Sequence, residues 1–153
     1  MKTTHDPGNS ATDIDALNSL LLGQMAAVES YDLAINKFED PHILTGLQSI
    51  REEHLQAEIQ LREKVLQMGG GPVETSEPWG ACSAAITHTE KVACPATALA
   101  ALKQGEEHSI NEFEDSLKNE SISANCKQVV QTNLLPTGRK HVAELNRLMG
   151  GMS

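Results

Sequence analysis

Hydrophobic residues recur every three or four positions over four long stretches of the chain, which is the spacing of one face of an α-helix. Thr12 and Asp40 can cap the first two predicted helices, and Gly69 ends the second. Pro136 falls inside the fourth and is expected to bend it, because proline has no backbone N–H. The pattern predicts an all-α protein with helices over residues 12–39, 41–68, 96–119 and 121–149.

A connector separates the second and third predicted helices. Residues 69–95 are rich in Gly, Pro, Ser and Thr, with one apolar island from Trp79 to Ile86 that can form a short helix. A connector of this length can carry the chain back along a bundle, so that the second and third helices run parallel. We therefore expect a disordered N-terminal tail over 1–11 and a single four-helix bundle domain over 12–150.

The chain also contains an internal repeat. A shift of 82 positions places Gln24 on Glu106 and Gly23 on Gly105, and a shift of 84 places Ala57 on His141. The first and third helices, and the second and fourth, are therefore versions of one pattern. This favours two related helical hairpins joined by the connector.

Composition agrees with this architecture and narrows the function. Of 153 residues, 39% are hydrophobic but only 3% aromatic, so aliphatic side chains typical of helix interfaces must build the core. The net charge of -9 argues against a nucleic-acid partner. The absence of a long apolar run argues against a signal peptide or membrane anchor, so we expect a cytoplasmic protein. Cys82, Cys94 and Cys126 show no metal or dithiol spacing and are interpreted as free, buried thiols.

Each predicted helix interrupts its apolar stripe near the same level of the bundle. The polar residues there are Gln24, His54, Glu106 and His141. A carboxylate buried without partners costs several kcal/mol, so Glu106 must be paired, hydrogen-bonded or bound to metal. Tyr31 lies two turns from Gln24 and is expected to reach this layer. The other helical glutamates are expected on a solvated face: Glu29, Glu53, Glu58, Glu107 and Glu112.

The sequence resembles the ferritin-like superfamily, and in particular a bacterial family of small ferritin-like domains of unknown function related to rubrerythrin and bacterioferritin. The resemblance rests on runs along nearly the whole chain: Leu17-Asn-Ser-Leu-Leu21, Tyr31, Met68-Gly-Gly-Gly-Pro72, Leu102-Lys-Gln-Gly-Glu106 and Leu134-Leu-Pro136 through His141. It implies a four-helix bundle with a long crossover between helices two and three, and a stress-associated bacterial protein.

The resemblance also implies a ligand pattern that this chain keeps only in part. In ferritin-like di-iron proteins, helices one and three each give a Glu, and helices two and four each give Glu-x-x-His. Glu106 and His141 match that pattern. Four positions differ from it: Gln24, His54, Ala57 and Gly138. A dinuclear iron site is therefore disfavoured.

Two functions remain open. In the first, Glu106, His54 and His141 bind one Fe or Zn ion, with Gln24 as a weak fourth partner. In the second, the protein is a metal-free structural or interaction module in which a protonated histidine holds Glu106. No motif supports hydrolysis, nucleotide binding or thiol catalysis, so an enzyme is not expected. The bundle shape and acidic faces would permit a homodimer.

Overall fold

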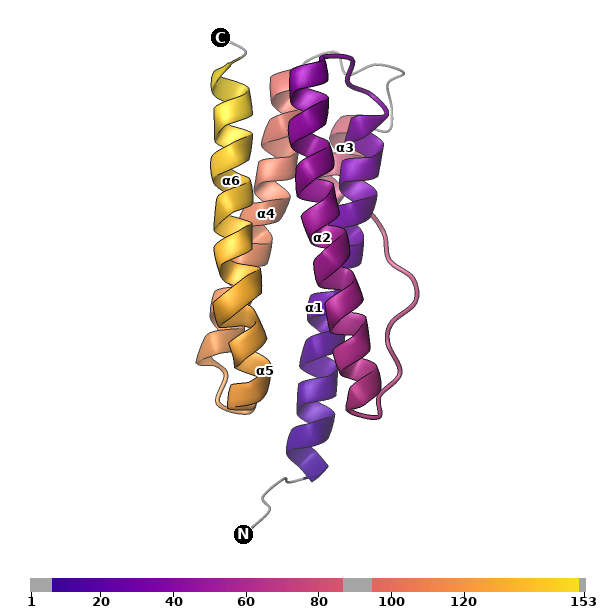
Figure 1. Cartoon of the computed structure of the whole chain (residues 1–153), viewed down its shortest axis with the longest axis vertical. Helices are drawn as coiled ribbons and strands as arrows, with labels where there is room; N and C mark the ends of the chain where they lie inside the picture. Colours follow the sequence, from indigo (N-terminus) through magenta and orange to yellow (C-terminus); the bar gives the residue numbers. More distant parts are fainter. Residues whose placement is uncertain (1–6, 87–94, 152–153) are drawn as a thin grey trace.

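The computed structural model describes residues 7–86 and 95–151, and this part of the chain is helical with no strand (Figure 1). The all-α prediction is therefore confirmed. The elements are α1 (Pro7–Ile35), α2 (Pro41–Gln67), α3 (Gly80–Ile86), α4 (Pro95–Lys118), α5 (Ala124–Val129), the π-helical turn η1 (Val130–Leu134) and α6 (Leu135–Gly150).

Helices α1 and α2 form one antiparallel hairpin, and α4 and α6 form the other (Figure 1). The connector runs along the outside of the bundle before α3, so α4 starts at the same end as α2 and runs parallel to it. This is the predicted four-helix bundle with a long crossover. The apolar island of the connector forms α3, as its composition suggested.

The first two helices begin and end at residues whose local chemistry fixes the backbone. The α1 helix begins at Pro7 rather than near Thr12, because proline has a fixed φ suited to the first helical turn. Residues 7–11 are thus helical and not part of a tail, while residues 1–6 lie outside the described residues. Asp40 caps α2 by accepting from the His42 N–H at 2.8 Å. Gly69 follows α2 with a positive φ of 83°.

The fourth predicted helix is divided. Ser123 caps α5, and its own N–H donates to Asp13 at 2.9 Å, so helical structure begins at Ala124 rather than at Ser121. The N–H of Leu135 then donates to the Val130 carbonyl, five residues earlier, which is the bond of a π-helix. The predicted disturbance is present, but it takes the form of a π turn immediately before Pro136.

Two hydrophobic clusters fill the bundle, with the polar layer between them. One lies around Tyr31, Leu102 and Leu145, and the other around Leu21, Leu61 and Phe113. Cys82 belongs to the first and Cys126 to the second, and both are free and buried as expected. Burial raises the pKa of the Cys82 thiol to about 12 and that of Cys126 to about 11. Cys94 lies outside the described residues.

Candidate metal site

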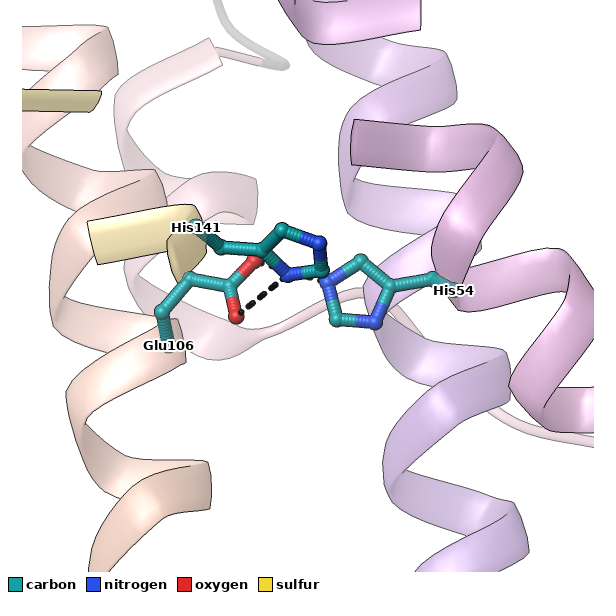
Figure 2. A group of neighbouring side chains, drawn as sticks. All are labelled: His54, Glu106 and His141. Atoms are coloured by element: carbon teal, nitrogen blue, oxygen red, sulfur yellow. Dashed lines mark hydrogen bonds and ion pairs between the residues drawn. The ribbon is translucent and has the colours of Figure 1, made fainter. Parts of the chain in front are cut away.

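Three of the predicted polar residues meet in the middle of the bundle: His54 from α2, Glu106 from α4 and His141 from α6 (Figure 2). Their exposed fractions are 4%, 1% and 2%, so all three are removed from solvent. Each offers one ligand atom, and these atoms lie within 4.8 Å of one another. The sequence placed these residues at one level, and the structure shows that they converge.

Glu106 is the centre of this group. Its Oε2 accepts from the Tyr31 hydroxyl at 2.6 Å and lies 2.7 Å from Nε2 of His54. Its Oε1 lies 3.4 Å from Nδ1 of His141 (Figure 2). Both carboxylate oxygens therefore have partners, and the prediction that Tyr31 reaches the polar layer is confirmed.

Each histidine is also held on its outer nitrogen. Nδ1 of His54 lies 2.7 Å from Oε1 of Gln24, and Nε2 of His141 lies 2.8 Å from Oε1 of Glu53. Both outer partners are oxygen atoms to which a ring N–H can donate, and the inner nitrogens face Glu106. Metal-bound histidines are typically oriented in this way, with the nitrogen opposite the metal donating to an oxygen. Gln24 therefore positions His54.

Glu53 lies only partly on the solvated face where it was expected. Its side chain is 34% exposed, and its second oxygen accepts from Lys140 Nζ at 2.7 Å while the first holds His141. Glu53 follows the buried Ile50 by three residues, so helical spacing places it at the edge of the buried stripe. That spacing was the signal that could have found it.

Electrostatics keep the group partly charged. Burial alone would raise the pKa of Glu106, but the adjacent His54 and His141 outweigh it and lower that pKa to about 2. Burial opposes the charge on His141, yet contacts with Glu106 and Glu53 raise its pKa overall. Burial, and then the nearby Glu106 charge, raise the pKa of Tyr31 well above 10.0, so Tyr31 stays a hydrogen donor.

A small cavity of about 20 Å³ lies beside the three residues. Gln24, Ala57 and Gly138 line it, together with Phe113. This volume is enough for about one water molecule. The positions that differ from the di-iron pattern thus surround one empty space, where long ligating side chains would otherwise project.

The opposite side of the layer is closed by Trp79. The ring centroid of Trp79 lies 6.1 Å from those of Tyr31 and His54. A Cβ on Gly105 would come within 2.1 Å of the Trp79 ring, so only glycine permits this approach to the α4 backbone. Sequence reasoning missed this contact. A glycine beside Glu106 in the middle of a helix was the available signal.

The donor set fits one ion. A tetrahedral ion with ligand distances of about 2.0–2.1 Å separates its ligand atoms by about 3.3 Å. Oε1 of Glu106 lies 3.4 Å from Nδ1 of His141, close to this value, but it is the other oxygen, Oε2, that lies 2.7 Å from Nε2 of His54. With one ligand atom from each residue, the three atoms lie within 4.8 Å of one another, so the side chains would have to shift to bind a common ion. Two imidazoles and a carboxylate are donors that both zinc and non-haem Fe(II) accept. Ala57 and Gly138 offer no ligand atom at two positions where the di-iron pattern has one.

The fold is a four-helix bundle with a long crossover, and the polar layer lies in its interior. The chain belongs to the family described as "Domain of unknown function (DUF2383)", whose model matches residues 12–119. It is also similar to a crystal structure of ferritin-like, diiron-carboxylate proteins from Bacillus anthracis str. Ames, with a TM-score of 0.69 and 19% identity over 92% of this chain and 97% of that chain. At this identity the likeness shows the fold. Comparison with functionally curated proteins gives no significant match.

Within residues 7–86 and 95–151, no helix combines the length and apolar character needed to cross a bilayer.

Proposed function

We propose that this protein binds a single divalent metal ion, Fe or Zn, through His54, Glu106 and His141. The observation that carries the proposal is the convergence of three buried donor atoms within 4.8 Å. Glu106 supplies the negative charge, and each imidazole supplies its inner nitrogen as a donor. A buried cation would balance the Glu106 carboxylate.

The hydrogen-bond partners of the outer histidine nitrogens also support metal binding. Gln24 and Glu53 hold the outer nitrogens of His54 and His141, which turns both inner nitrogens toward Glu106. Such partners raise the basicity of a ligand and fix its orientation. The small cavity leaves space beside the three donors for a water molecule to complete the coordination.

A second function is favoured by a different observation. In the described part of the chain, every buried side-chain nitrogen and oxygen has a hydrogen-bond partner without any ion. The polar layer is therefore complete as a hydrogen-bond network. This supports the alternative that the protein is a metal-free structural or interaction module on a ferritin-like scaffold.

The metal content of tag-free protein distinguishes the two functions. The protein is incubated with Zn²⁺, or with Fe²⁺ in the absence of oxygen, passed through a desalting column and measured by elemental mass spectrometry. Single-ion binding predicts about one equivalent. About two equivalents would mean that the ligands are assigned wrongly, and none would favour the metal-free module.

Two histidine variants locate the bound ion. His141→Ala removes one of the three donors and is expected to abolish stoichiometric binding while the helices remain, as checked by circular dichroism. His108→Ala is the matched control, because His108 is 71% exposed on α4, away from the polar layer. Equal retention of metal by both variants would contradict the assignment.

A further inference from the structure

The buried polar layer is approached from two sides of the bundle. A groove of about 330 Å³ lies between α1 and α4, and another of about 440 Å³ lies between α2 and α6. Both grooves share lining residues with the inner cavity. Gln24 and Phe113 line the α1–α4 groove and the cavity, while Glu53 and His141 line the α2–α6 groove and the cavity.

The charges of the two grooves differ. The charged residues that line the α1–α4 groove are Asp15 and Glu112, and its other polar lining consists of hydroxyl and amide side chains. The α2–α6 groove contains Lys140 and Arg147 beside its carboxylates. Lys140 pairs with Glu53 and Arg147 pairs with Glu144, so these charges of the α2–α6 groove cancel. A cation is attracted more strongly by a cleft whose charged residues are all carboxylates.

The wall of the α1–α4 groove is also open at Gly23. A Cβ built on Gly23 meets no atom within 4 Å. Its repeat equivalent, Gly105, is covered by the Trp79 ring, so packing explains one glycine and not the other. Glycine inside a helix costs about 1 kcal/mol relative to alanine. The groove beside Gly23 is also lined by the neighbouring Gln24, so a long side chain at position 23 would project into the space before the polar layer.

We propose that a divalent cation reaches the polar layer through the α1–α4 groove, passing between Gln24 and Phe113. This inference rests on the proposed metal-binding function. Asp15 and Glu112 attract the hydrated ion, and the hydroxyl and amide oxygens along the groove take the place of part of its water. The Gln24 amide, whose oxygen contacts His54, is the last polar group before the three donors.

Metal-uptake kinetics test this route. Zn²⁺ is mixed with the full-length protein in a stopped-flow instrument, and its transfer from a chromophoric chelator is followed. Gly23→Leu fills the α1–α4 groove, Gly23→Ala controls for helix propensity at the same position, and Ser49→Leu fills the α2–α6 groove. Ser49 is exposed and lines that groove, so it is a matched site.

Gly23→Leu is expected to slow association by about tenfold or more, with the same final stoichiometry and equilibrium affinity. Gly23→Ala and Ser49→Leu are expected to load as the wild type does. The double variant Asp15→Asn/Glu112→Gln, which changes no packing in the core, is expected to slow association and reduce its dependence on salt.

The outcomes separate the route from the function. Slower loading by Ser49→Leu with normal loading by Gly23→Leu and by the double variant would overturn the route and place it between α2 and α6. Normal loading by all variants would also overturn it, while leaving single-ion binding intact. A wild-type protein that takes up no zinc would overturn the proposed function and the route together.

Discussion

The two helical hairpins follow one sequence pattern, but they contribute differently to the polar layer. The α4–α6 hairpin supplies Glu106 and His141. At the equivalent positions the α1–α2 hairpin has Gln24 and Ala57, and its one donor in the converging group is His54. One hairpin therefore provides the buried carboxylate and one imidazole, whereas the other provides one imidazole, an amide and part of a cavity.

This difference indicates how a repeated fold can keep part of a site. His54 and Gly138 are equivalent positions in the repeat, as are Ala57 and His141. Each histidine of one hairpin therefore corresponds to a small residue in the other hairpin. The two small residues, Ala57 and Gly138, line the same cavity. The remaining donors meet at Glu106, which also accepts from Tyr31, so the polar layer is asymmetric.

Removal of the buried carboxylate should have the largest effect. Glu106→Ala leaves two imidazoles and the Tyr31 hydroxyl without their shared acceptor, and we expect a loss of about 3–5 kcal/mol in the free energy of unfolding. The equivalent variant Gln24→Ala removes one neutral acceptor from His54 and should cost about 1 kcal/mol. Urea unfolding measures both. Equal losses would contradict the asymmetry between the hairpins.

Tyr31→Phe should have the next largest effect. It removes the hydroxyl that donates to Glu106 at 2.6 Å and leaves the ring in place. A hydrogen bond to a charged group contributes about 1.5–3 kcal/mol, and the loss is expected within this range. The repeat equivalent Phe113→Tyr should change stability by less than about 1 kcal/mol, because Phe113 borders a cavity. A smaller loss from Tyr31→Phe than from Phe113→Tyr would reverse the comparison.

Alanine substitutions at the equivalent glycines, Gly105 and Gly23, should change the stability of the protein in opposite directions. Gly105→Ala places a methyl group against Trp79 and should destabilise the protein by about 1–3 kcal/mol. Gly23→Ala meets no atom and should stabilise it by up to about 1 kcal/mol. Thermal unfolding of the two variants shows whether each substitution raises or lowers the stability. Stabilisation by both would show that Trp79 does not constrain α4.

The smallest effect is expected from pH above neutrality. The pKa of His141 is raised from 6.5 in the folded protein, so its contribution is present below pH 6.5 and is lost as pH rises through the folded pKa. The pKa of Glu106 is lowered from 4.5 to about 2, so its contribution is present above pH 4.5 and is lost toward pH 2. Metal-free protein should be most stable between these ranges. A flat unfolding midpoint from pH 5 to pH 9 would exclude the charged network.

Local sequence signals predicted the helices well where a single residue type controls the backbone. Asp40 and Gly69 delimited α2 correctly, because capping and a positive φ act within one turn. The π turn before Pro136 was not predictable in the same way. Proline requires a local adjustment, but packing around Val130 and Leu134 decides which form the adjustment takes.

For the candidate site, periodicity predicted which residues face inward but not which atoms meet. It placed Glu106, His54 and His141 at one level, and it suggested the contact of Tyr31. Glu53 was missed because its stripe position is borderline and its role depends on the ring orientation of His141. Trp79 was missed because the path of the connector brings it to Gly105, and no helical period encodes that path.

Anomalous X-ray diffraction at the zinc absorption edge tests the central claim most directly. Crystals of the wild-type protein grown with Zn²⁺ should show one strong peak bounded by Nε2 of His54, the Glu106 carboxylate and Nδ1 of His141. That peak should be absent in His141→Ala crystals. Peaks confined to exposed carboxylates, or two peaks in the bundle interior, would contradict a single-ion site built from these three residues.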